Sequence, residues 1–334
     1  MNMDNLQGLL TIPTKESSAE EVLTPTREAY RKLLAETSSS SQAGTEHRHI
    51  AKEPEKTLDL PDIVCDRRLN LLDWGCNNIL AVALNNTVYL WNATSGSTSE
   101  LVTVSDTFAP VTSVSWAPDC HSIAIGLNDS HVHLYDPSTS KMIRSLQGNH
   151  QSLPVGSLAW NKHLLTTGSA DGVIINHDVM IRSPVVSTYD EHTDAICSLK
   201  WSSSGQYLAS GGNDKLLHIW DISKCSPLHR FVACCGAKVI GSWSARSLTK
   251  NQLVLWKHSS MSKMAELAGH TSPVLYLAQS PDGCTVASAS GDEKLKLWRI
   301  FEKSTIKIKD VSGSTATGIL SNGTRPDYIF GYIF

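Results

Sequence analysis

The stretch VYLW at residues 88–91, a β-forming run closed by tryptophan, returns along the chain and decides the fold. Related runs end at six closing positions: Trp91, Tyr135, His177, Trp220, Trp256 and Trp298. The intervals between them are 44, 42, 43, 36 and 42 residues. A period of 40–45 residues with this content is typical of a propeller of four-stranded blades. We therefore predict an all-β chain, a β-propeller with six recognisable repeats.

Polar residues recur at fixed distances before two of the closing tryptophans. An aspartate lies six residues before the tryptophan and a serine ten residues before it, as Asp214 and Ser210 do for Trp220. With an upstream histidine they would form a hydrogen-bonded chain, because a buried indole N–H needs an acceptor. The predicted structural networks are His192, Ser210, Asp214 and Trp220, and His270, Ser288, Asp292 and Trp298.

Serine, histidine and aspartate together could also suggest a hydrolase. We prefer the structural interpretation, because a catalytic triad has no reason to recur from repeat to repeat. The chain has no G-x-S-x-G elbow and no phosphate-cradling glycine loop. We expect no catalytic residue, no metal and no cofactor, and hence a non-enzymatic scaffold that binds proteins.

Charge and cysteine content exclude further classes. The 334 residues carry 29 Lys and Arg against 32 Asp and Glu, a net charge of −3, which argues against nucleic acid as a partner. No run of 18 apolar residues exists, so we expect no membrane partner. None of the eight cysteines forms a C-x-x-C pair, and we expect reduced thiols in an intracellular protein.

The composition changes near residue 57. Residues 1–56 are rich in Ser, Thr, Glu and Lys, so we expect a disordered N-terminal segment, with a short helix near 26–36. We expect the propeller over 57–302, with a strand near 58–63 closing against the last repeat, and an irregular C-terminal tail over 303–334.

Six strings within residues 57–300 resemble the Fizzy family of WD-repeat activators of the anaphase-promoting complex, most of all its plant-type cell-division-cycle members. They are TLDLPDIV (57–64), LNLLDWG (69–75), VGSLAW (155–160), SGGND (210–214), NQLVLWK (251–257) and AELAGHTS (265–272). Generic WD repeats do not share these strings. The resemblance identifies the chain as a truncated or degenerate member.

The resemblance implies a function in cell division and mitosis, in the ubiquitin conjugation pathway. In the family the propeller binds degrons, the D-box on its side and the KEN box on its top face, and holds substrate near the ubiquitin ligase. The implied partners are anaphase-promoting complex subunits, degron-bearing cell-cycle proteins and spindle-checkpoint proteins. The implied location is the nucleus and the cytoplasm.

Three departures concern the ring and its anchors. The family has seven blades, whereas only 36 residues separate Trp220 from Trp256, and residues 231–243 look like a fusion across a deletion. The C-box, which carries an arginine, is missing, and the nearest string is LTIP at residues 10–13. The chain ends in Phe334 instead of the family's Ile-Arg pair. We therefore expect weakened ligase binding and poor stimulation of ubiquitination.

The degron-binding positions implied by the resemblance are Leu84, Asn85, Asn213 and Pro273. The family has an aspartate where Asn85 stands and an arginine where Pro273 stands. Asn85 can still accept a hydrogen bond, but charge-assisted bonds are roughly twice as strong. Two interpretations stay open: a substrate-recruiting activator, or a degenerate paralogue or decoy propeller that binds proteins without activating the ligase.

Overall fold

The computed structural model describes residues 50–105, 110–147, 150–224, 226–232, 251–257 and 262–300, and the backbone of three strands within 305–330. They belong to the second of two compact units, Ile50–Phe334. The helix expected near 26–36 lies outside the described residues, as does the expected disordered segment up to residue 49.

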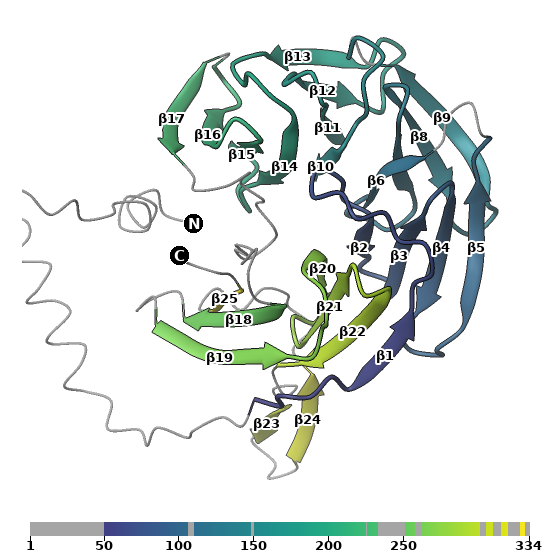
Figure 1. The fold of residues 1–334 in the computed structure, drawn as a ribbon, viewed down its shortest axis with the longest axis vertical. Coiled ribbons are helices and arrows are strands. Elements are labelled where there is room, and N and C mark those ends of the chain that lie inside the picture. Colours follow the sequence, from purple (N-terminus) through teal and green to yellow (C-terminus); the bar gives the residue numbers. More distant parts are fainter. Residues whose placement is uncertain are drawn as a thin grey trace, which may run out of the picture. The chain divides into compact units, whose positions relative to one another are not determined.

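Every described element is a β-strand, and five sheets have four antiparallel strands each (Figure 1). The first contains β2 Leu72–Trp74, β3 Ile79–Leu84, β4 Thr87–Asn92 and β5 Thr98–Thr103. The second contains β6 Val111–Trp116, β7 Ile123–Leu127, β8 His131–Asp136 and β9 Lys141–Gln147. The third contains β10 Ser157–Asn161, β11 Leu164–Gly168, β12 Ile174–Asp178 and β13 Val185–Tyr189. The fourth contains β14 Ile196–Trp201, β15 Tyr207–Gly212, β16 Leu216–Asp221 and β17 Pro227–Val232. The last contains β1 Lys56–Asp59, β20 Val274–Gln279, β21 Thr285–Ser290 and β22 Lys294–Arg299.

Burial within a sheet falls from its inner strands to its outer one. All five residues of β7 (IAIGL) are buried, whereas most of β9 (KMIRSLQ) is exposed. Inner strands therefore read as continuous apolar runs, because neighbouring sheets cover both of their faces.

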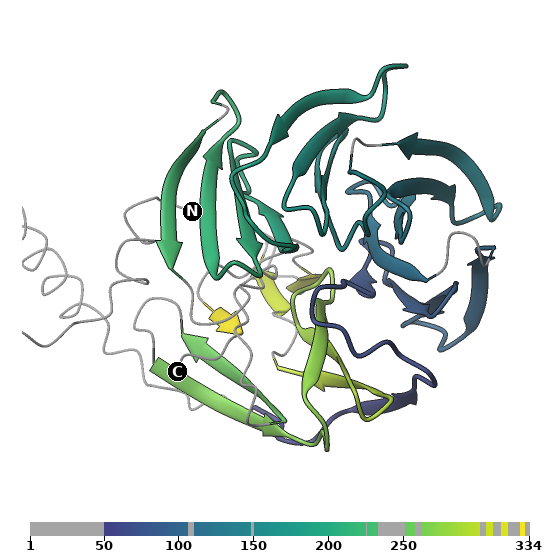
Figure 2. The ribbon, with the colours of Figure 1, turned by 45° about the horizontal axis from the view of Figure 1, so that its top comes forward.

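The innermost strands contact one another in the order β20, β2, β6, β10 and β14 (Figures 1 and 2). The five sheets therefore follow one another as blades of a propeller, as expected. The largest core cluster joins apolar side chains of the last, first and second sheets, including Leu297, Leu80 and Ile125. In the five four-stranded sheets the closing position lies on the third strand counted from the innermost one, so the repeat spacing located these strands correctly.

The first strand of the chain completes the last blade. Strand β1 pairs antiparallel with β22, from Lys56 opposite Leu297 to Asp59 opposite Lys294. The expected closing strand is therefore present, two residues earlier than we placed its start. Order begins earlier still, because Ile50 packs against a core cluster and Glu55 N–H donates to Leu297 O. Residues 50–56 were wrongly assigned to the disordered segment.

The fifth repeat, which Trp256 closes, forms a different sheet. Strand β18, Gln252–Lys257, pairs on one edge with β19, Ser262–Ala268, and on the other with β25, Tyr328–Phe330. In the five other sheets the corresponding strand pairs with the strand before it in the chain. Among the described residues no sixth sheet of four strands occurs. Residues 233–243 of the segment that looks like a fusion across a deletion lie outside them.

Three segments of the tail that we expected to be irregular, 303–334, are strands. Strands β23, Thr305–Lys309, and β24, Thr315–Ile319, form an antiparallel hairpin, and β25 joins β18. The sequence TIKIK of β23 alternates polar and apolar residues, which is the period of a strand.

The expectation of reduced thiols is wrong for one pair. Cys76 and Cys120 form a disulfide with their Cα atoms 6.0 Å apart. Cys76 follows β2 and Cys120 follows β6, so neighbouring sheets bring together residues 44 positions apart. Spacing along the chain could not show this contact, because it depends on how two blades pack.

Candidate protein-interaction surface

The four residues with an implied degron role lie at one end of the sheets, where the second strand turns into the third or where the chain enters the innermost strand. Leu84 and Asn85 are at the β3–β4 turn, and Asn213 is at the β15–β16 turn. Pro273 directly precedes β20. Strands β2 and β20 are in contact, so Leu84, Asn85 and Pro273 belong to neighbouring sheets. Asn213 belongs to the sheet at the other end of the series, beyond β6 and β10.

Asn85 is exposed in a tight turn. Its φ of 53° is left-handed, a conformation that asparagine tolerates better than most residues. Leu84 pairs with Thr87 across this turn, and the carbonyl of Asn85 accepts a hydrogen bond from Val111 N–H at 2.9 Å. The backbone is therefore fixed from both sides, which leaves the amide side chain of Asn85 at the surface.

The predicted network of the fourth sheet is present and holds the turn that carries Asn213. Trp220 Nε1–H donates to Ser210 Oγ at 2.8 Å, and Ser210 Oγ lies 2.8 Å from His192 Nε2. His192 Nδ1 lies 2.7 Å from Asp214 Oδ2. An indole can only donate and a carboxylate can only accept, so the chain of bonds runs from tryptophan through serine and histidine to aspartate.

Asp214 also ties the turn to the loop that enters β14. Its carboxylate accepts from Thr193 N–H at 3.1 Å and from Leu216 N–H at 3.0 Å. The neighbouring Asn213 donates its amide to Asp194 Oδ2 at 2.6 Å. Asn213 is therefore held in place, and one amide donor is already used within the chain.

The last sheet repeats this arrangement beside Pro273. Trp298 Nε1–H donates to Ser288 Oγ at 2.8 Å, and His270 bridges Ser288 and Asp292 at 2.7 and 3.0 Å. The turn also meets the entering loop, because Gly291 N–H donates to the carbonyl of Pro273 at 3.3 Å. The exposed Pro273 ring thus stands on a fixed backbone.

A third network escaped the sequence analysis. His150 Nε2 lies 2.8 Å from Thr167 Oγ1, which lies 3.1 Å from His177 Nε2. Asp171 stands six residues before His177 and Thr167 ten before it, so the spacing already indicated this site. We missed it because threonine replaces serine and histidine replaces tryptophan.

Burial and hydrogen bonding set the protonation of these groups. Burial alone would raise the pKa of Asp214, but hydrogen bonds from Leu216 N–H and His192 outweigh it and lower the pKa. Asp292 behaves in the same way, with Thr271 N–H and His270 as donors. Burial lowers the pKa of His177 and of His218 to about 4 each, so both imidazoles are neutral at pH 7.

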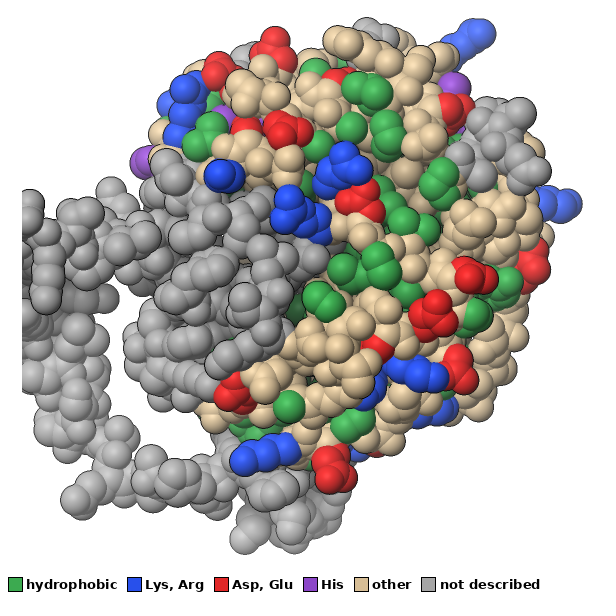
Figure 3. Space-filling view, in the orientation of Figure 1, with side chains coloured by type: hydrophobic (Ala, Val, Ile, Leu, Met, Phe, Trp, Pro, Cys, Tyr) green, Lys and Arg blue, Asp and Glu red, His purple; other side chains and the backbone are tan. Residues whose placement is uncertain are grey.

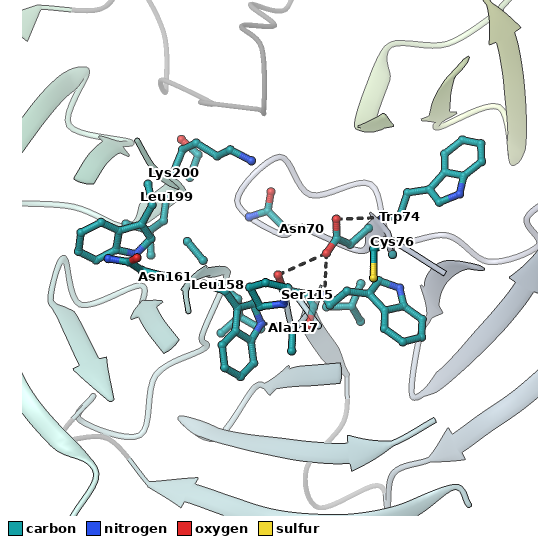
Figure 4. Close-up of a pocket in the computed structure, with 18 of the residues that line it drawn as sticks. Asn70, Trp74, Cys76, Ser115, Ala117, Leu158, Asn161, Leu199 and Lys200 are labelled. Carbon is teal, nitrogen blue, oxygen red and sulfur yellow. Dashed lines mark hydrogen bonds between the residues drawn. The ribbon is translucent and has the colours of Figure 1, made fainter. Parts of the chain in front are cut away.

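A cavity of about 510 Å³ opens at the opposite end of the innermost strands (Figure 4). Asp73 lies in its wall and accepts from Trp116 N–H at 2.7 Å, Trp74 N–H at 3.0 Å and Ser115 Oγ–H at 3.3 Å. Burial raises the pKa of Asp73, and these bonds together with the charge of Lys200 oppose the rise. Since its carboxylate already has three donors, we assign Asp73 a structural role between the first two sheets.

Acidic and basic side chains are interspersed on the face shown in Figure 3. No group of three or more His, Cys, Asp or Glu side chains that could hold a metal ion occurs among the described residues. Within the same residues, no helix is long and apolar enough to cross a membrane.

Two protein-family models match parts of the chain. The family model "WD domain, G-beta repeat" matches residues 183–221 and 261–299, which contain the two predicted networks. The model "Anaphase-promoting complex subunit 4 WD40 domain" matches residues 102–163.

Individual relatives cover far more of the chain. "Cell division cycle 20.1, cofactor of APC complex" from Arabidopsis thaliana is 45% identical over 90% of this chain and 85% of its own length. "Anaphase-promoting complex subunit cdc20" from Dictyostelium discoideum is 40% identical over 77% of this chain and 62% of its own. A chain of the "Crystal Structure of Mitotic Checkpoint Complex" matches 76% of this chain and 97% of its own with a TM-score of 0.69 and 32% identity.

The relatives are named as cofactors or subunits of the complex, which confirms the interpretation of the chain as a non-enzymatic adaptor. The identity and coverage of the plant relative exceed what a shared propeller alone would give. The chain belongs to the Cdc20/Fizzy family of activators of the anaphase-promoting complex.

Proposed function

We propose that this chain recruits degron-bearing cell-cycle proteins to the anaphase-promoting complex, in the nucleus and the cytoplasm. Its partners are then subunits of that complex, its substrates and, given the likeness to a mitotic checkpoint structure, spindle-checkpoint proteins. The observation that carries the proposal is the pair of His–Asp networks, which fix the turns beside Asn213 and Pro273 at the end of the sheets that also displays Asn85.

A second candidate is a decoy propeller that binds proteins without activating the ligase. Two observations favour it. Asn85 presents no charge at a position where a carboxylate would bind an arginine more strongly. Asn213 already gives one amide donor to Asp194. A pull-down of the chain from dividing cells, probed for core subunits of the complex, separates the candidates, because only the activator retains them.

The affinity for a D-box peptide gives a sharper test. We expect Asn85→Asp to bind an arginine-containing D-box peptide roughly 5–10-fold more tightly than the unaltered chain, because the new bond is charge-assisted. The readout is fluorescence anisotropy of the labelled peptide. Asn128→Asp is the matched control, since Asn128 is exposed in the corresponding β7–β8 turn of the next sheet. An equal gain in both variants, or in neither, would count against a degron site at Asn85.

A further inference from the structure

The disulfide between Cys76 and Cys120 joins the turns that follow the innermost strands of the first two sheets. Both residues line the cavity, and Figure 4 shows the sulfur of Cys76 beside it. The backbone N–H of Cys76 also points at the Cys120 sulfur, with the two atoms 2.7 Å apart. This site lies at the end of the sheets away from Asn85 and Asn213.

The two sulfur atoms are held together by contacts that do not depend on the bond between them. Asp73, which directly precedes Trp74 on β2, accepts hydrogen bonds from Ser115 and Trp116 on β6. A Cβ atom on Gly75 would lie 2.9 Å from Trp116 Cδ2, so the first turn packs closely on the second sheet. A Cα separation of 6.0 Å is within the usual range for a disulfide. The pair can therefore open and close without rearranging the backbone.

The surroundings of Cys76 favour reaction with a soluble thiol or disulfide. Cys76 is exposed, whereas Cys197 and Cys284 are buried. Disulfides in reducing compartments are usually transient and respond to redox state. Cys120 is half-buried, so Cys76 is the sulfur that a soluble reagent reaches. A pair held at bonding distance with one exposed member meets both conditions for reversible exchange, access and proximity.

We propose that Cys76 and Cys120 form a reversible redox link between the first two sheets, which exchanges with a low-molecular-weight disulfide such as oxidised glutathione. The thiolate of Cys76 attacks glutathione disulfide, forms a mixed disulfide and releases one glutathione thiolate, which takes up a proton. The Cys120 thiolate then attacks the Cys76 sulfur and releases the second. Two cysteine thiols are oxidised while one glutathione disulfide is reduced to two glutathione molecules.

Thiol counting tests the proposal. The full chain is equilibrated in glutathione buffers of increasing oxidised fraction, quenched with acid, alkylated and weighed. We expect the alkylated thiols to fall from eight to six, and a non-reducing digest to give a linked peptide pair containing Cys76 and Cys120. Absence of that pair at every glutathione ratio, or its persistence in excess reduced glutathione, would overturn the proposal.

Thermal unfolding gives an independent readout. Linking residues 44 positions apart constrains the unfolded chain, so we expect the Tm to rise roughly 5–10 °C on oxidation. Cys76→Ser should abolish the rise, while Cys65→Ser, a change at another exposed cysteine, should keep it. A rise of the same size in Cys76→Ser would assign the effect to other thiols and contradict the proposal. None of these readouts depends on ligase binding or degron binding.

Discussion

The third and fourth sheets place polar side chains at the same four positions but connect them differently. In the fourth sheet the aspartate–histidine contact, Asp214 to His192, is 2.7 Å. In the third sheet the corresponding atoms of Asp171 and His150 are 3.5 Å apart, and neither has a hydrogen-bond partner among the described residues. Both aspartates are almost completely buried, so exposure does not explain the difference.

The residue at the closing position explains why the aspartate–histidine contact differs between the two sheets. Trp220 can only donate, so it fixes the direction of every bond in the fourth sheet. His177 takes that position in the third sheet and can donate or accept through Nε2, so the direction of the bonds is not imposed. The comparison teaches that the obligatory indole donor, more than the spacing of the polar residues, completes such a network.

The largest expected effect separates the two aspartates. Asp214→Ala removes the acceptor of His192, Thr193 and Leu216 and should cost roughly 1–3 kcal/mol of unfolding free energy. Asp171→Ala removes one hydrogen bond, from Val173 N–H, and should cost less than about 1 kcal/mol. Urea denaturation of both variants gives the comparison. Equal losses would show that the long contact at Asp171 stabilises as much as the short one. Unchanged stability in Asp214→Ala with loss of a binding activity would contradict the structural role.

Acid should weaken the third sheet through His177. Its pKa is about 4 in the folded chain against about 6.5 when unfolded, so the unfolded chain binds the extra proton between these values. The contribution of the neutral His177 to the free energy of unfolding is complete above pH 6.5. It should fall by about 1.4 kcal/mol for each pH unit as the pH decreases towards 4. The pKa of Asp214 is lowered in the folded chain. Its contribution to the free energy of unfolding is therefore lost only when the pH falls below its pKa in the unfolded chain, about 3.9.

His218 of the fourth sheet also has a pKa of about 4, so variants must separate the two histidines. We expect His177→Gln and His218→Phe each to remove part of the slope of stability against pH between 6.5 and 4. Denaturant midpoints at several pH values measure it. If neither variant flattens the slope, the buried histidines are not its source.

The smallest expected effect is at the Asp171 side chain itself. Asp171→Asn replaces the buried oxygen Oδ2, which has no hydrogen-bond partner in the described structure, so the free energy of unfolding should change by less than about 0.5 kcal/mol or increase. Asp214→Asn is the matched control and should destabilise, because its carboxylate accepts a bond from His192. A clear loss in Asp171→Asn would show that the 3.5 Å contact between Asp171 and His150 stabilises the fold after all.

The repeat predicted the strands because a closing position such as Trp91 ends an apolar run that neighbouring sheets must bury. It also located two networks, since serine, aspartate and tryptophan lay at equal spacings. It could not locate contacts between blades. Cys76 meets Cys120 through packing of two sheets, and Ile50 joins a core cluster from within a polar segment. The implied degron positions were placed on turns by resemblance, and no pattern indicated that Asp194 would engage Asn213.

The pairing of β1 with β22 also determines when the last blade can close while the chain is being synthesised. Asp59 and Lys294 form an ion pair across 235 residues of chain. At 5–20 residues per second the ribosome needs roughly 12–47 s to make that stretch. Throughout this interval the first strand has no partner edge to pair with, so the nascent chain carries an unpaired strand while the sheets between are completed. Closure of the last blade is therefore the step at which chaperone protection would matter most to this protein.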